Sequence, residues 1–264
     1  MKRKTQREWA KEELKNPPIV EALIEIRWKL QKGSGPNPID PHYQLLVGSL
    51  YSKIKDRYEF HEALPVSQVS DEVTGSVVKH RFRVAEGEWP LIQIGPGVMT
   101  VNQTKRYSTY ESFKPLVLDA IKHLYAEYGG ELVIEKLLLR YIDAKKFDYA
   151  ENDVCEFLSS KMGIEIKHFD SVYQEGAIEK KPTSLHLQSS FRCNDPAGTA
   201  TLSFSTGSHK DERSIVWNQI LQSEGDDVPD MPDGFEEWID GAHRVVKKWF
   251  DDLIEGDLKR EFNE

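Results

Sequence analysis

An alternation of apolar and polar residues near the start of the chain predicts a half-buried β-strand. In the run VEALIEIRW at 20–28, apolar side chains alternate with Glu21, Glu25 and Arg27. Successive side chains of a strand point to opposite faces, so one face would be buried and the other polar. Apolar residues then recur at helical spacing over 43–58, which predicts an amphipathic helix after the strand.

Four strand-like runs and a long helical pattern come next. The last two runs flank Gly95-Pro96-Gly97, where proline in the second position and glycine in the third are typical of a type II turn. A phosphate-binding loop is disfavoured because Pro96 has no N–H to donate and a strand, not a helix, follows. The segment therefore predicts a hairpin. The strand-like runs lie around 64–70 and at 76–84, 89–94 and 98–104, and the helical pattern covers 110–128.

The order of elements then restarts, which indicates an internal duplication. The two long helices align at a constant offset, since Tyr110-Glu111-x-Phe113 matches Phe235-Glu236-x-Trp238. The counterpart of the Pro-Gly turn would be a longer connection at 206–214. The second half reads as a strand at 132–147, a helix at 151–163, strand-like runs at 165–175, 184–193, 199–206 and 214–222, and a helix at 235–254.

Both long helices have candidate amino-terminal caps. Ser108 and Asp233 each precede a glutamate by three residues, which is the spacing of a capping box. Pro115 would lie about two turns inside the first helix. This helix is therefore expected either to kink at Pro115 or to begin later, with Ser112 as its cap.

Together these patterns predict an α+β fold in which two pseudo-repeats of strand, helix, meander and long helix form one curved antiparallel sheet with helices on one face. We expect a charged segment at 1–18, a first half-repeat at 19–130 and a second at 131–264, joined as one integrated unit. In topology alone, this order is similar to the duplicated halves of the TATA-box-binding protein.

Three stretches carry a more specific resemblance. NPPIVEALIEIRW, LIQIGPGVMTVNQ and EEWIDGAHRVVKKWF resemble a sporadically distributed, functionally uncharacterised prokaryotic protein family of about this length. The resemblance covers nearly the whole chain from Asn16 onward. It implies a single conserved unit in a prokaryotic cytoplasm, and it supplies no catalytic residues.

The net charge of the chain limits the classes of partner that we expect. The 264 residues include 44 Asp and Glu against 35 Lys and Arg, a net charge of −9. Such a chain is not attracted to phosphate backbones in general, which counts against nucleic acid as a partner. No apolar stretch reaches the roughly 18 residues of a membrane span. A cytoplasmic location without a membrane partner is expected, with Cys155 and Cys193 as free, buried thiols.

The sequence contains no strong catalytic or metal-binding motif. There are eight histidines, and none forms an HExxH pattern. His243 lies at the edge of the apolar stripe of the last helix, where we expect a hydrogen bond to the sheet backbone. A metal site would need ligands from distant segments to converge. We therefore predict no metal and no cofactor.

The polar side of the sheet contains the candidate site. Strand alternation would place arginines there together with a few acidic and amide side chains, and arginine binds carboxylate or phosphate through two parallel hydrogen bonds. The alternative is a solvated face with cross-strand Glu–Arg pairs, and a single bulge would move residues to the other face. The candidate ligand-binding residues are Glu25, Arg27, Arg81, Arg83, Asn102, Arg140, His186 and Arg192.

Three hypotheses for the function follow. The first is a non-catalytic binding protein that uses the polar sheet face for a small acidic ligand or a protein partner. The second is an enzyme whose site lies at the junction of the two halves, and the absence of a catalytic motif counts against it. The third is a nucleic-acid-associated accessory protein in defence or regulation, which the net charge disfavours. The sequence leaves open whether the chain forms a homodimer.

Overall fold

The computed structural model describes residues 14–104, 109–167, 169–174 and 176–264. Its strands are β1 (Ile19–Trp28), β2 (Phe60–Ala63), β3 (His80–Arg83), β4 (Leu91–Gly95), β5 (Val98–Gln103), β6 (Ile134–Lys146), β7 (His186–Asn194), β8 (Ala197–His209) and β9 (Glu212–Glu224). Its α-helices are α1 (Tyr43–Ile54), α2 (Asp71–Thr74), α3 (Tyr110–Glu127), α4 (Val154–Met162), α5 (Phe235–Ile254) and α6 (Asp257–Glu261). Single 3₁₀ turns lie at η2 (Pro65–Gln68), η3 (Asp170–Val172) and η4 (Gly225–Asp227).

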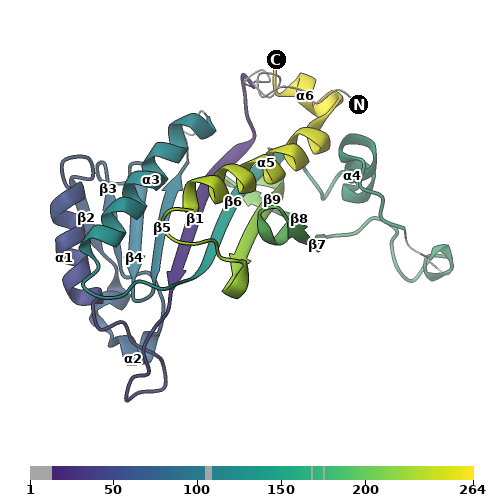
Figure 1. The fold of residues 1–264 in the computed structure, drawn as a ribbon. Coiled ribbons are helices and arrows are strands. Elements are labelled where there is room, and N and C mark those ends of the chain that lie inside the picture. Colours follow the sequence, from purple (N-terminus) through teal and green to yellow (C-terminus); the bar gives the residue numbers. More distant parts are fainter. Residues whose placement is uncertain (1–13, 105–108, 168, 175) are drawn as a thin grey trace.

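The nine described strands form one antiparallel sheet in the order β2-β3-β4-β5-β1-β6-β9-β8-β7. Helices α1, α3 and α5 lie across one face of it (Figure 1). The predicted α+β fold, with one curved antiparallel sheet and helices on one face, is therefore confirmed, and the sheet is open. None of the described helices has the length and apolar composition needed to cross a bilayer.

The sheet is arranged around the pair β1 and β6. Outward from β1 the order is β5, β4, β3, β2, and outward from β6 it is β9, β8, β7. This mirrored order is what two fused half-repeats would produce, but the duplication itself stays a prediction. The two meanders differ, because the first has four strands and the second has three.

Two predicted strands are absent from the described sheet. The run at 64–70 is mainly the 3₁₀ turn η2, which begins at Pro65; proline lacks the N–H that a ladder needs and fits the first turn of a helix instead. The described part of 165–175 contains the 3₁₀ turn η3 and no strand. Both predictions were wrong because an alternating pattern favours a strand only where a neighbouring strand is available for pairing.

The hairpins confirm one prediction and correct another. Gly95 pairs with Val98, and Gly97 has φ +69°, as the third position of a type II turn requires. The connection between β8 and β9 is as short, because β8 continues to His209 and β9 begins at Glu212. The predicted longer connection is therefore wrong: Lys210 and Asp211 alone form the turn, both with positive φ.

The helix termini also differ in part from their predicted form. α3 begins at Tyr110 and contains Pro115, and its cap is Thr109, whose Oγ1 accepts from the backbone of Ser112. The predicted cap Ser108 lies outside the described residues. α5 has no side-chain cap at its amino terminus, where Gly234 rather than Asp233 is the boundary residue.

The main core lies between the sheet and helices α1, α3 and α5. The apolar face of β1 is buried throughout, from Ala22 to Trp28, with at most 2% of any of these side chains exposed. Trp28 also donates from its indole nitrogen to the Asp40 carboxylate at 2.8 Å. A second apolar cluster joins α4 and α6 to β8 and β9 around Trp217. Cys155 and Cys193 are free, but both are partly exposed, not fully buried as predicted.

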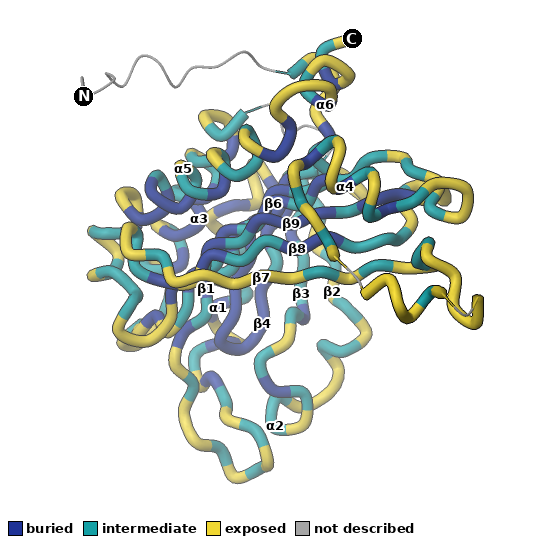
Figure 2. The backbone as a smooth tube through the Cα atoms, turned by 90° about the vertical axis from the view of Figure 1, so that its right-hand side faces the viewer, coloured by how far each residue is buried: buried dark blue, intermediate teal, exposed yellow. Residues whose placement is uncertain are grey.

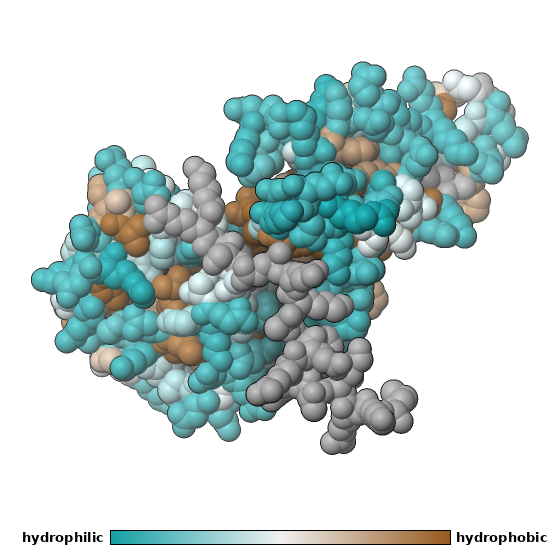
Figure 3. Space-filling view, turned by 90° about the horizontal axis from the view of Figure 1, so that it is seen from above, coloured by the Kyte–Doolittle hydropathy of each residue, from teal (hydrophilic) through white to brown (hydrophobic). Residues whose placement is uncertain are grey.

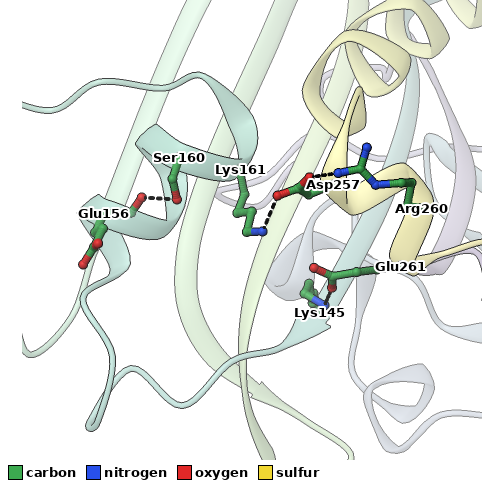
Figure 4. A network of polar contacts seen from close by, with 7 residues as sticks. All are labelled: Lys145, Glu156, Ser160, Lys161, Asp257, Arg260 and Glu261. Carbon is green, nitrogen blue, oxygen red and sulfur yellow. Dashed lines mark hydrogen bonds and ion pairs between the residues drawn. The ribbon is translucent and has the colours of Figure 1, made fainter.

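Polar contacts attach the last helix to the rest of the protein. Asp257, at the start of α6, accepts from Lys161 of α4 at 2.7 Å and also from Arg260. Glu261, at the end of α6, accepts from Lys145 of β6 at 2.5 Å (Figure 4). The side chains are partly exposed, so these pairs position α6 more than they stabilise it.

One carboxyl group lies inside the covered face of the sheet. Asp143 of β6 is 1% exposed, and Gln219 bridges it to Trp217: the amide nitrogen donates to Asp143 Oδ2 at 3.0 Å, and the amide oxygen accepts from the indole at 3.0 Å. Burial raises the pKa of Asp143 to about 8, against the opposing hydrogen bond from Gln219. Asp143 is therefore protonated in the folded protein at neutral pH.

We expect Asp143→Asn to flatten the dependence of stability on pH. The unfolded chain releases this proton above the ordinary pKa of 3.8 and the folded chain above about 8, so the carboxyl makes folding less favourable as pH rises between these values. In the unmodified chain, this carboxyl should lower the free energy of unfolding by on the order of 3 kcal/mol between about pH 5 and about pH 8, and Asp143→Asn should abolish that decrease. Urea unfolding at both pH values measures this, with the exposed Asp230→Asn as the control. Equal slopes for Asp143→Asn and the unmodified chain would contradict the assignment.

Candidate functional site

The polar face of the sheet, defined here as the face opposite α1, α3 and α5, contains all eight candidate residues. Register places them there: Glu25 is paired with Thr100 of β5, which is paired with Gln93 of β4 and, through it, with Arg81 of β3. Glu25 is also paired with Leu138 of β6, so the same row of side chains continues across the sheet toward its opposite edge. No bulge separates the candidates from one another within a strand, so the predicted alternation holds in space.

The candidates nevertheless do not converge on one point. Arg81 on β3 and Arg192 on β7 are seven strand positions apart in the sheet order. At about 4.8 Å per strand, this separation is roughly 34 Å. A single small ligand cannot contact both residues. The eight positions therefore divide into local groups.

The first group is an ion pair on the central strand. Arg27 donates from Nε to Glu25 Oε1 at 2.7 Å and from Nη2 to Glu25 Oε2 at 3.2 Å. Arg27 also contacts Ser76, whose Oγ accepts at 3.0 Å. The segment containing Ser76 lies directly on the sheet here, because a Cβ on Gly95 would be 1.9 Å from the carbonyl oxygen of Val77. Arg27 therefore holds the segment containing Ser76 against the sheet.

The second group is a pair of arginines around Glu62 of β2. Arg83 donates from Nε to Glu62 Oε2 at 3.3 Å, and Arg81 lies 3.7 Å from Glu62 Oε1. The Arg83 guanidinium also lies 5.4 Å from the centre of the Trp89 ring, a cation–π contact. Glu62 is therefore shared by the two arginines, and Arg83 makes the shorter contact with it.

The third group lies at the far edge, on β7. Arg192 binds the Asp227 carboxylate through both terminal nitrogens, one contact being 2.7 Å. The hydrogen bonds from Arg192 lower the pKa of Asp227 below its ordinary value. His186, at the start of β7, is exposed. It lies six residues from Arg192 along the strand, so the two are not neighbours.

A chain of hydrogen bonds runs through the middle of the polar face. Arg81 donates to Gln93 at 2.8 Å, and the Gln93 amide donates to Thr100 at 3.1 Å and to Asn102 at 3.2 Å. The Asn102 amide then donates to Glu21 Oε1 at 2.7 Å. Thr100 and Asn102 are 6% and 4% exposed, so this chain is a buried polar network in which each member satisfies the next.

Arg140 is the exception among the arginines of this face. It donates from Nε and Nη2 to Asn218 Oδ1 at 3.0 and 2.7 Å, and the Asn218 amide donates in turn to Ser203 at 3.1 Å. Within the described residues, no carboxylate lies at ion-pairing distance from Arg140. Its direct hydrogen-bond partner is therefore a neutral amide, with Glu21 and Glu25 of β1 only at the diagonal positions of the ladder, and part of its five-donor fork remains available.

Apolar side chains surround Arg140 on all four sides. Across the ladders it faces Leu23 of β1 and Ile220 of β9. Along β6, Leu138 and Ile142 precede and follow it on the same face. All four side chains are partly buried. The centre of the polar face is thus a guanidinium group within an apolar ring, which suits a ligand with both an acidic group and an apolar body.

A second polar cluster connects α3, α5 and β6, on the covered side of the sheet. His243 Nδ1 lies 3.0 Å from the Tyr141 hydroxyl, and its ring stacks on Tyr110 with centroids 3.8 Å apart. The predicted backbone partner is therefore wrong, since the partner is a tyrosine side chain. Burial, with Lys247 nearby, lowers the pKa of His243 to about 4. The imidazole is neutral at neutral pH and packs as a structural group.

The sequence alone does not reveal which side chain pairs with each arginine of the polar face. Glu62, Asp227 and Asn218 come from strands and turns distant in sequence, and no local pattern connects them to Arg83, Arg192 or Arg140. Within the described residues there is also no cluster of three or more side chains that could hold a metal ion. A scan of protein-family models and a search of curated proteins found no match to this chain.

We expect Asn102→Ala to destabilise the fold, because it would leave Glu21 and Gln93 without their buried partner. Removing one member of a satisfied buried network costs about 1–3 kcal/mol. Urea unfolding measures the loss of free energy. Gln188→Ala, an exposed position on the same face, is the matched control. A loss no larger than that of the control would show that the hydrogen-bonded chain contributes nothing to stability.

Proposed function

We propose that this chain is a non-catalytic binding protein whose polar sheet face binds an acidic, apolar segment of a protein partner, with Arg140 as the central contact. The observation that carries the proposal is the environment of Arg140: neutral hydrogen-bond partners and an apolar ring. Guanidinium recognises a carboxylate through two parallel hydrogen bonds. The apolar ring would bury the side chains beside that carboxylate.

The other arginines support a single anchor over a broad cationic surface. Arg27, Arg83 and Arg192 already have carboxylate partners. A strongly anionic polymer would have to displace those carboxylates, which counts against nucleic acid. A sheet face spanning several strands also suits an extended partner segment better than a small ligand, which is usually enclosed by a cavity.

The remaining hypotheses stay predictions. A catalytic site at the junction of the halves would have to use the residues of β1 and β6 that face away from the helices, chiefly Leu23, Glu25, Leu138 and Arg140. These offer a guanidinium and a carboxylate, and the carboxylate of Glu25 is already paired with Arg27. Membership of the prokaryotic family and a cytoplasmic location are likewise proposals, on the residues quoted for them above.

We expect a blocked Ser-Leu-Glu-Leu-Ser peptide to shift the Nε–Hε resonance of Arg140 in nitrogen-15 NMR. The matched peptide with glutamine in place of glutamate should bind about tenfold more weakly, because a charge-assisted hydrogen bond contributes about 1.5–3 kcal/mol. Arg140→Gln should lose the preference for glutamate. Arg140→Lys should retain only part of it, since an ammonium group lacks the planar fork.

Arg27→Gln provides the control, because the Arg27 side chain is already paired with Glu25. This variant should bind the glutamate peptide as the unmodified protein does. Equal binding of the glutamate and glutamine peptides, or undiminished binding by Arg140→Gln, would refute Arg140 as the anchor.

A further inference from the structure

The strand β7 forms one edge of the sheet. Within the described residues it pairs with β8 alone, from His186 opposite Ser205 to Asn194 opposite Ala197. Figure 2 shows β7 crossing the front of the molecule with most of its length exposed. The backbone N–H and C=O groups on its outer side are therefore available to another strand.

This edge lacks most of the features that usually prevent strand addition, and its one charged side chain, Arg192, is paired with Asp227. Native edge strands are commonly short or carry lysine or proline. The opposite edge fits that description, because β2 has four residues. β7 has nine residues, HLQSSFRCN, with neither lysine nor proline. It also exposes 54% of Phe191, whose ring contacts Trp249 of α5 edge-on at 5.9 Å.

We propose that β7 pairs antiparallel with β7 of a second copy of this chain, with the two-fold axis at Ser190. This register opposes Ser190 to itself, Gln188 to Arg192 and His186 to Asn194, so all nine residues of β7 are paired. A register centred one residue away would pair fewer residues. The interface is isologous, since the same strand contributes both halves.

The side chains of β7 are compatible with this pairing on both faces. On the polar face, the charged Arg192 lies opposite a neutral glutamine, and its own charge is already balanced by Asp227. On the helix side, Leu187 lies opposite Cys193 of the second copy, and Phe191 lies opposite Ser189 of that copy. No like charges are directly opposed, which is the arrangement that cross-strand pairing favours.

The pairing would join the polar faces of two copies into one continuous surface, because residues directly opposite each other share a face. In the view from above, hydrophilic side chains dominate and hydrophobic ones appear in small groups (Figure 3). This inference does not depend on the proposed role of Arg140.

Light scattering coupled to size-exclusion chromatography tests the dimer. The full chain should have twice the 30.4 kDa mass of one copy. Ser190→Lys should reduce it to a single copy, because it opposes two ammonium groups at the axis. Position 190 is exposed, so the variant should keep its fold, which circular dichroism checks. Ser208→Lys, at an exposed position of β8 outside the interface, should remain dimeric.

Crosslinking tests the register. In a background with Cys155→Ser and Cys193→Ser, Ser190→Cys should form a disulfide-linked dimer under mild oxidation, because directly opposite residues are within disulfide range. Gln188→Cys should not, because the two copies of that residue would be about 13 Å apart. A full chain with the mass of one copy, a Ser190→Lys variant that stays dimeric, or crosslinking of Gln188→Cys in preference to Ser190→Cys would overturn the proposal.

Discussion

The register between β1 and β6 is the constraint on which the rest of the structure depends. Opposing Leu23 to Arg140 and Ile24 to Leu139 puts Glu25, Arg27 and Arg140 on the face away from the helices and buries Ile24, Ile26 and Trp28 beneath them. A slip of one residue would exchange the two faces. The bulges at both ends of the pair, beside Ile19 and Trp28, lie outside this central stretch, so the assignment of faces is uniform where the site is proposed.

Much of this arrangement could be predicted from the sequence, because it depends on local periodicity. The alternation in 20–28 predicts β1 and its polar side, and proline and glycine at 96 and 97 predict the hairpin. The predictions at 64–70 and 206–214 were wrong for a common reason: strand pairing is a non-local property. Pro65 terminates one candidate strand, whereas the ladder between β8 and β9 extends the other up to a two-residue turn.

The state of each arginine could not be predicted in the same way. Alternation places Arg27, Arg83, Arg140 and Arg192 on one face, but their chemistry depends on which acceptor lies next to them in space. Three have a carboxylate and one has an amide. That difference distinguishes a charge fixed within the fold from one with spare hydrogen-bonding capacity, and it arises from strand order and turns that local sequence does not encode.

The central claim is that Arg140 selects an acidic group at the middle of the polar face. Reversing its charge tests this most directly. The affinities of Arg140→Glu for blocked Ser-Leu-Glu-Leu-Ser and Ser-Leu-Lys-Leu-Ser peptides can be compared with those of the unmodified protein. The account predicts that the preference changes from the glutamate to the lysine peptide, since the apolar ring is retained and only the sign of the anchor changes. An unchanged preference for the glutamate peptide would contradict it.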